Sequence, residues 1–219
     1  FLDIGGESTR PGSETVSLDD ELERVIPVIE ALKDRVNIPL SIDTYKSTVA
    51  EEELKEGAVL VNDISGFRFD KKMSEVTANH NAPCILMHIK GTPKDMQKDP
   101  QYDDVVREVY DYLAESVKIA RQAGIKQIIT DVGIGFGKTL DHNLTLIKNL
   151  GKFKELGYPI LMGLSRKSFM DKIHPTPVED RLEGTIAANT VSIVNGANII
   201  RVHDVLYNKR AARVAYKLK

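Results

Sequence analysis

The sequence predicts an α/β protein with a parallel sheet and a site at the carboxyl ends of its strands, and three observations support this. An apolar, β-branched run ends in a polar cluster seven times along the 219 residues, and helical patterns separate these runs. Glycines follow four of the helical patterns, which keeps the connections to the next strand short. The connections after the strands are longer and richer in Gly, Ser, Thr, Arg and Lys. This asymmetry is typical of a (β/α)8 barrel, although an open doubly wound sheet would also place its site there.

The expected strands are short, and a polar tip follows each. They lie at residues 1–6, 38–42, 59–61, 82–87, 127–129, 159–164 and 199–200. Their tips are Glu7 to Arg10, Asp43 with Thr44, Asn62 with Asp63, His88, Thr130 with Asp131, Ser165 to Lys167, and Arg201 to Asp204. A barrel of this kind has eight strands, and the sequence supplies seven. Because the chain begins directly on a strand, we expect that an upstream segment is absent.

Helical patterns fill the intervals between the strands. Apolar residues repeat at helical spacing over residues 18–33, where Ser17 is placed to cap the amino terminus. We expect Asp141 to cap the fifth helix. The other helices are expected at residues 47–56, 72–79, 102–122, 142–156, 179–195 and 206–218.

Composition indicates a single globular domain over residues 1–219, since no linker-like stretch divides the chain. The net charge of −2 gives no electrostatic reason to expect a nucleic-acid or anionic-membrane partner. No apolar run approaches the ~20 residues that a membrane span needs. One cysteine, Cys84, excludes an internal disulfide and favours a cytoplasmic protein. Because Cys84 lies inside an apolar run, we interpret it as a buried core residue.

Three tips carry an isolated acid or amide: Asp43, Asn62 and Asp131. Any one of them is more simply a turn or cap residue, but three at equivalent positions indicate a site. Carboxylates accept hydrogen bonds from ring N–H and exocyclic NH₂ groups, and an amide both donates and accepts. The set therefore suits a nitrogen-rich heterocycle.

Basic residues gather at the same tips. Arg201 and His203 are two apart, so an extended backbone projects both side chains in one direction. An arginine and a histidine at the mouth of a barrel suit a phosphate or diphosphate. The other basic candidates are Arg10, Lys138, Arg166 and Lys167.

Other catalytic motifs are absent. Residues 133–139 look like a P-loop, but that motif requires glycine where Val132 stands. We interpret this stretch as a tight loop whose glycines let the backbone approach a ligand. There is no G-x-S-x-G, H-E-x-x-H or C-x-x-C, and the five histidines show no metal-ligand spacing.

Taken in order, the tips resemble the dihydropteroate synthase family along the whole chain. The matching motifs are DIGGESTRPG from Asp3, SIDT from Ser41, NDI from Asn62, LMH from Leu86, DVGIGFGK from Asp131, GLSRKS from Gly163 and RVHD from Arg201. The resemblance implies a (β/α)8 barrel that joins 6-hydroxymethyl-7,8-dihydropterin diphosphate to p-aminobenzoate, with release of diphosphate and formation of 7,8-dihydropteroate. It also implies a homodimer.

The resemblance further implies a role for each matched residue, with Asp43, Asp131, Lys167 and Arg201 as the catalytic set. The pterin would contact Asp43, Asn62, Ile64, Met87, Asp131, Lys167 and Arg201. The diphosphate would lie near Thr9, Arg10, Arg201 and His203, with Arg166 as a further candidate. p-Aminobenzoate would pack near Thr9, Pro11, Phe136, Lys167 and Ser168.

Two features depart from the family pattern. Val132 stands where the family usually has proline, which changes backbone stiffness more than ligand chemistry. The family's first strand, which carries an asparagine that helps to bind Mg²⁺, has no counterpart here. Asp3 is the metal candidate that remains near that region.

Three alternative readings stay open. One is a corrinoid-dependent methyltetrahydrofolate methyltransferase, which shares the pterin-binding barrel but has no use for the diphosphate residues Arg201 and His203. Another is a ligand-binding or inactive remnant, because one strand is unaccounted for. A phosphosugar-processing barrel fits the acids and the amide less well.

Overall fold

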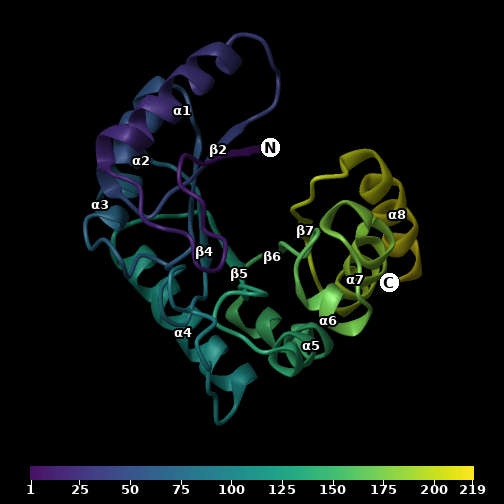
Figure 1. Ribbon diagram of the computed structural model, residues 1–219. Helices are drawn as coiled ribbons and strands as arrows, with labels where there is room; N and C mark the ends of the chain where they lie inside the picture. Colours follow the sequence, from purple (N-terminus) through teal and green to yellow (C-terminus); the bar gives the residue numbers. More distant parts are fainter.

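Seven parallel strands lie side by side in chain order in the computed structural model, which describes all 219 residues (Figure 1). They are β1 (Leu2–Ile4), β2 (Leu40–Asp43), β3 (Leu60–Asp63), β4 (Cys84–Met87), β5 (Ile128–Asp131), β6 (Ile160–Met162) and β7 (Ile199–Ile200). β1, β4 and β6 are shorter than the expected runs, whereas β2, β3 and β5 extend into their polar tips at Asp43, Asp63 and Asp131. The expected parallel sheet is confirmed.

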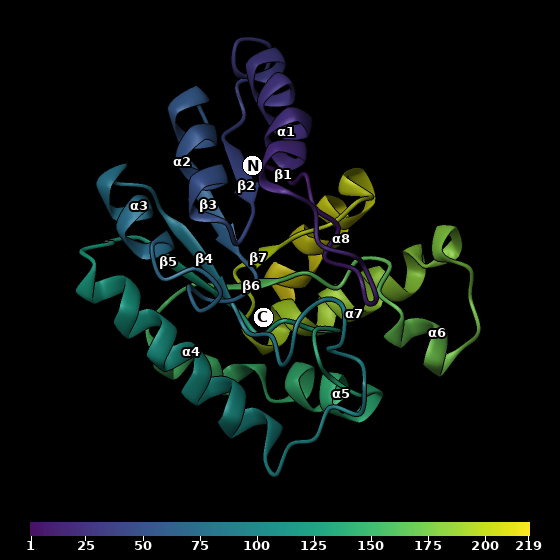
Figure 2. The same cartoon turned by 60° about the vertical axis from the view of Figure 1, so that its left-hand side comes forward.

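Helices form the outer layer and follow the strands around the curled sheet (Figures 1 and 2). They are α1 (Leu18–Lys33), α2 (Ser47–Glu56), α3 (Met73–Asn79), α4 (Val105–Gln122), α5 (Leu140–Lys148), α6 (Phe169–Ile173), α7 (Leu182–Asn195) and α8 (Val205–Leu218), with 3-10 helices η1 (Leu150–Leu156) and η2 (Val178–Asp180). No ladder joins β7 to β1, so the sheet is a barrel that stays open between its first and last strands. None of the helices is long and apolar enough to span a membrane.

Two helices, α1 and α2, begin and end where the sequence predicts. Ser17 caps α1 as expected, since its Oγ accepts from the Asp20 backbone N–H at 3.1 Å. The expected helix at 142–156 is wrong in two ways, because α5 begins at Leu140 and stops at Lys148. Thr139, and not Asp141, caps it in a capping box with His142.

Two further boundaries and one element differ from expectation. The fourth helix begins at Val105 and not at residue 102. Asp104 caps it, because its side chain accepts from the backbone N–H groups of Val106 and Arg107. The helix expected at 179–195 begins at Leu182, because η2 forms first. The five-residue α6 was not expected, since so short a segment shows no helical period.

The core lies between the sheet and the helices in two large apolar clusters, and a third, small cluster lies at the strand ends. Cys84 is buried in one large cluster as a free thiol, which confirms its interpretation as a core residue. The small cluster consists of Ile64, Met87, Ile89 and Met96, with Tyr45 and Phe136 packed against it. It places an apolar wall beside the polar tips.

Candidate active site

An ion pair between Asp3 and Arg201 joins the two ends of the open sheet. Asp3 Oδ2 accepts from Arg201 Nη1 at 2.9 Å and from Asn62 Nδ2 at 2.9 Å, and Asp3 Oδ1 accepts from Ser41 Oγ at 2.7 Å. Arg201 Nη2 also lies 3.7 Å from Asp131 Oδ2. The expectation that the tips converge is therefore confirmed. We call Asp3, Ser41, Asn62, Arg201 and Asp131 the hub. The sequence did not indicate that Asp3 pairs with Arg201, because the two residues are 198 positions apart in the chain.

Asp43 and Asn62 each leave a buried oxygen without a hydrogen-bond partner. The register of β2 and β3 sets these residues opposite each other, and the unpartnered atoms are Asp43 Oδ1 and Asn62 Oδ1. Such an atom costs about 1–3 kcal/mol when it is left unsatisfied. Burial, followed by the charge of Asp3, raises the pKa of Asp43 to about 7. Two adjacent acceptors without donors are suited to a ligand rich in N–H groups.

Asp131 ends β5, and Lys167 lies in the loop that follows β6. Asp131 is almost fully buried, and its Oδ1 accepts from the Gly133 backbone N–H at 2.8 Å. Lys167 donates to the Ile134 carbonyl, and its Nζ lies 4.7 Å from the centre of the Phe136 ring. Burial lowers the pKa of Lys167 to about 8, against the opposing effect of Asp131. The Lys167 ammonium beside the face of the Phe136 ring is suited to bind an aromatic acid.

The residues expected to bind diphosphate gather more loosely. His203 is exposed, and its Nδ1 lies 2.9 Å from Ser165 Oγ. Burial lowers the pKa of His203, and the charge of Arg166 adds to this effect, while Asp204 opposes it. Thr9 is half-buried, whereas Arg10, Pro11 and Ser168 are exposed.

Two of the basic candidates are engaged elsewhere. Arg166 makes a two-pronged pair with Asp204, at 3.1 and 2.8 Å, which neutralises much of its charge. Lys138 is only 1% exposed and donates to His88 Nδ1 at 2.8 Å, so its grouping with the phosphate-binding cations is wrong. It lies beneath the loop that follows β5, where no anion could reach it.

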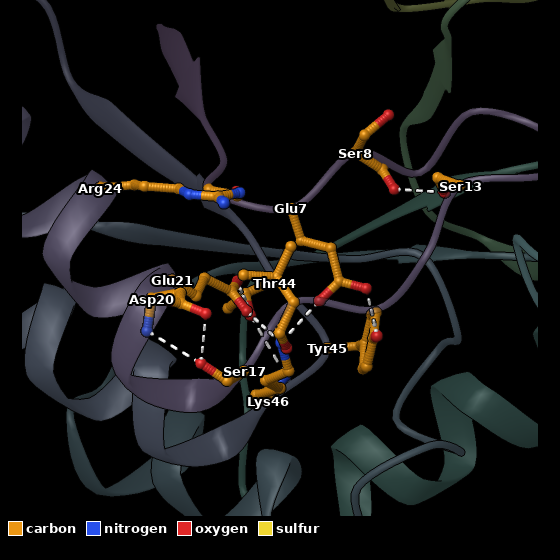
Figure 3. Close-up of polar contacts among 12 residues, drawn as sticks. Glu7, Ser8, Ser13, Ser17, Asp20, Glu21, Arg24, Thr44, Tyr45 and Lys46 are labelled. Carbon is orange, nitrogen blue, oxygen red and sulfur yellow. Dashed lines mark hydrogen bonds and ion pairs between the residues drawn. The ribbon is translucent and has the colours of Figure 1, made fainter.

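A clamp that the sequence did not indicate holds the loop after β1. In Figure 3, Lys46 lies between the carboxylates of Glu7 and Glu21, and the Tyr45 hydroxyl donates to Glu7. Thr44 Oγ1 donates to Glu21 at 2.8 Å, and Lys46 also donates to the Val16 carbonyl at 2.7 Å. Because Glu7 and Val16 flank Thr9, Arg10 and Pro11, this clamp ties both ends of that loop to the tip of β2.

We expect Lys46→Met to lower the free energy of unfolding by about 3 kcal/mol, because two nearly buried carboxylates lose their counter-ion. The Glu7 and Glu21 side chains are only 5% and 2% exposed. Urea unfolding measures the change. Lys55→Met is the matched control, since Lys55 pairs with Glu51 and Glu52 at the surface and its loss should change little. Equal losses of unfolding free energy in the two variants would show that the clamp does not stabilise the fold.

Comparisons with known proteins agree with this geometry. A model of the family described as pterin binding enzyme matches residues 1–203. The chain is 48% identical to the dihydropteroate synthase of Clostridium beijerinckii, over 98% of this chain and 78% of that protein. Among solved structures, the Clostridium difficile dihydropteroate synthase in the presence of pteroic acid has a TM-score of 0.93 and 45% identity, covering 99% of this chain and 81% of that one.

The Thermus thermophilus dihydropteroate synthase, solved in complex with 4-aminobenzoate, has a TM-score of 0.94 and 39% identity. The alignment covers all of this chain and 84% of that one. Identity of this order over nearly the whole chain, together with the family model, leaves one classification. The chain belongs to the dihydropteroate synthases of the pterin-binding enzyme family.

Proposed function

We propose that the chain condenses 6-hydroxymethyl-7,8-dihydropterin diphosphate with p-aminobenzoate to give 7,8-dihydropteroate and diphosphate. The observation that carries the proposal is the pair of buried, unpartnered oxygens on Asp43 and Asn62, together with the buried carboxylate of Asp131. The dihydropteroate synthase names of close relatives support the same reaction.

The pterin ring would lie between the carboxylates and the apolar wall. Its ring N–H and amino groups would donate to Asp43, Asn62 and Asp131, while Lys167 would donate to a ring acceptor. Ile64 and Met87 are buried at the same strand ends and would pack against the ring. Arg201, whose guanidinium is planar and a quarter exposed, is suited to stack on the open face.

The reaction needs placement and charge stabilisation more than a nucleophile. The C–O bond from the pterin methylene to the diphosphate breaks, and its electron pair leaves on the diphosphate. Arg201, Arg10, Thr9 and His203 would hold this anion as its charge develops. The electron-rich ring stabilises the carbon centre until the aniline nitrogen forms the new C–N bond and then loses a proton to solvent. Asp43 and Asp131 hold the ring in position through both steps.

p-Aminobenzoate would enter beside the loop that follows β5. Its carboxylate suits Lys167 and Ser168, and its ring suits the face of Phe136. Thr9 and Pro11 would close over it from the clamped loop. The contact between Lys167 and Phe136 supports this placement.

Release of diphosphate on mixing the two substrates tests the proposed function, with omission of p-aminobenzoate as the control. Methyl transfer from methyltetrahydrofolate without diphosphate release would favour the corrinoid-dependent alternative. Pterin binding by calorimetry without turnover would favour a ligand-binding remnant.

Pterin affinity should fall as the pH drops below about 7. Because the pKa of Asp43 is raised to about 7, this carboxyl must lose a proton before it accepts from pterin N–H groups. At pH 6 binding should release protons, and the affinity should fall by up to about tenfold per pH unit. Calorimetry at pH 6, 7 and 8 in buffers of different ionisation enthalpy measures both effects.

The sign for stability is opposite to the usual carboxylate case. The pKa of Asp43 in the folded chain lies above the ordinary value of 3.8, so this group lowers the free energy of unfolding as the pH rises from 3.8 to about 7. Asp43→Asn should therefore remove the pH dependence of pterin binding and raise the melting temperature at pH 8. A pH response that persists in this variant would reject Asp43 as its source.

Mg²⁺ stays a prediction, because the residues present do not form a metal site by themselves. No three His, Cys, Asp or Glu side chains gather in a way that could hold a metal ion. Both oxygens of Asp3 already accept from Ser41, Asn62 and Arg201. The steps described above depend on the side chains of this chain alone. The homodimer and the cytoplasmic location also stay predictions.

A further inference from the structure

The loop from Gly133 to Gly137 has an unusual hydrogen-bond pattern. Each of its five successive carbonyl groups accepts from a side chain. The donors are Lys138 to Gly133 at 2.8 Å, Lys167 to Ile134, Gln97 to Gly135, Lys138 to Phe136 at 2.9 Å, and Tyr102 to Gly137 at 2.7 Å. Gly133, Ile134 and Gly137 are buried, and buried carbonyl groups need partners within the protein. This loop is fastened along its whole length.

Lys138 is the centre of this pattern. An ammonium has three N–H donors, and Lys138 directs them to Gly133 O, Phe136 O and His88 Nδ1. Burial lowers the pKa of His88 well below its usual value, and the charge of Lys138 adds to this effect, so the ring stays neutral and accepts. Burial, followed by the charge of Lys167, lowers the pKa of Lys138 well below its usual value. Its three acceptors nevertheless favour the ammonium, because each of them stabilises the charged form.

The loop lies directly on the backbone that follows β4. Gly133 and Gly137 both have positive φ, and a Cβ on them would lie 1.9 Å from the His88 carbonyl oxygen and 2.3 Å from the Lys90 carbonyl oxygen. No side chain fits at these two positions. The loop therefore packs directly against the backbone of residues 88–90, and Lys138 hydrogen-bonds to it from inside.

We propose that Lys138 is a positioning residue that sets Phe136 and Lys167 in place for p-aminobenzoate. It acts through the Phe136 carbonyl, which it holds, and through the Ile134 carbonyl, which lies between its two anchors and receives Lys167. The expected effect on p-aminobenzoate rests on the proposed function. The three hydrogen bonds from Lys138, which we call the brace, are a property of the fold.

Lys138→Met keeps the length of the side chain but removes all three donors. We expect the KM for p-aminobenzoate to rise by about tenfold or more, because the loss of an orienting partner typically weakens a site by this much. The affinity for pterin diphosphate should fall by a smaller factor, because Lys167 is the only proposed pterin ligand that Lys138 positions, whereas Asp43, Asn62 and Asp131 belong to strands. Lys126→Met, at an exposed lysine outside the loop, should match the parent chain. An unchanged KM, or equal losses for both substrates, would overturn the proposal.

A double-mutant cycle with Phe136→Ala tests the route. If Lys138 acts through Phe136, the double variant should show a KM close to that of the weaker-binding single variant. Effects that multiply as independent changes would show that Lys138 does not act through this ring.

Hydrogen exchange tests the brace without turnover. The Phe136 amide donates to Gly133 O at 3.1 Å, and the Gly135 amide donates to Asn143 Oδ1 at 2.8 Å. In Lys138→Met both amides should exchange about tenfold faster or more, while α7 stays unchanged. Unchanged exchange in Lys138→Met would reject the proposed role of Lys138 in holding the loop. Failure of the parent chain to release diphosphate is a separate outcome, which would reject the proposed function. If Lys138→Met does not fold, Tyr102→Phe removes one outer donor and should shift exchange the same way by about threefold. No shift there would also overturn the brace.

Discussion

Lys167→Ala and Asp131→Asn should each lower the affinity for pterin diphosphate by about a hundredfold, since a hydrogen bond to a charged group contributes about 1.5–3 kcal/mol. Asp131 is almost fully buried, and Lys167 has a pKa lowered to about 8, so neither charge is screened by much water. Asp131→Asn keeps the shape of the side chain and an oxygen for the Gly133 amide. Its effect should therefore come from the lost charge rather than from a collapsed loop.

Titration calorimetry with the pterin diphosphate measures both losses. Asp141→Asn and Lys148→Ala are matched controls, because both residues are exposed on α5. We expect the controls to bind as the parent chain does. Unchanged affinity in both Asp131→Asn and Lys167→Ala would sink the pterin assignment, and with it the placement of p-aminobenzoate beside Lys167.

Arg201→Met should reduce kcat by about a thousandfold, the upper part of the range for losing one preorganised charge-stabilising group. Arg201 is the cation shared by the hub, since it bonds to Asp3 and lies 3.7 Å from Asp131. It would also meet the departing diphosphate. Its removal takes away transition-state stabilisation and leaves the carboxylates facing one another.

The pH dependence of the Arg201 variant separates these two effects. Because Arg201 lowers the pKa of Asp43, its loss should raise that pKa above about 7 and move the pH at which pterin binds upward. Diphosphate release and pterin binding measured between pH 6 and 9 report both changes. Arg201→Lys should recover the pH shift but little of the rate, since an ammonium keeps the charge without the planar fork. Arg213→Met, at an exposed position on α8, serves as the control. An unmoved pH curve in Arg201→Met would contradict the charge balance proposed for the hub.

The site holds buried polar atoms without protein partners at a cost to stability. Asp43 Oδ1 and Asn62 Oδ1 are buried without donors, and Asp43 carries a raised pKa. A protein selected only for stability would pair or remove these atoms. Their presence at adjacent strand ends is the physical sign of a ligand that supplies the missing N–H groups.

Local signals explain which sequence predictions succeeded. The strands and most helices follow from apolar period and from caps such as Ser17, since these interactions join residues within about four positions of each other. The boundary error at α5 arose where two candidate caps, Thr139 and Asp141, compete. There the choice depends on a ring nitrogen of His142 that a pattern of residue types does not reveal.

The sequence by itself determined the parallel sheet, the polar tip of each strand and the family, because alternating strand and helix patterns and ordered motifs are local properties of the chain. Only the tertiary structure decided which tip residues meet. The order of the strands brings Arg201 to Asp3, which is 198 positions earlier in the chain, while the fold pairs Arg166 with Asp204 and buries Lys138 beneath its own loop. Charge pairing and burial depend on distance in space, and that distance exists only once the sheet has curled.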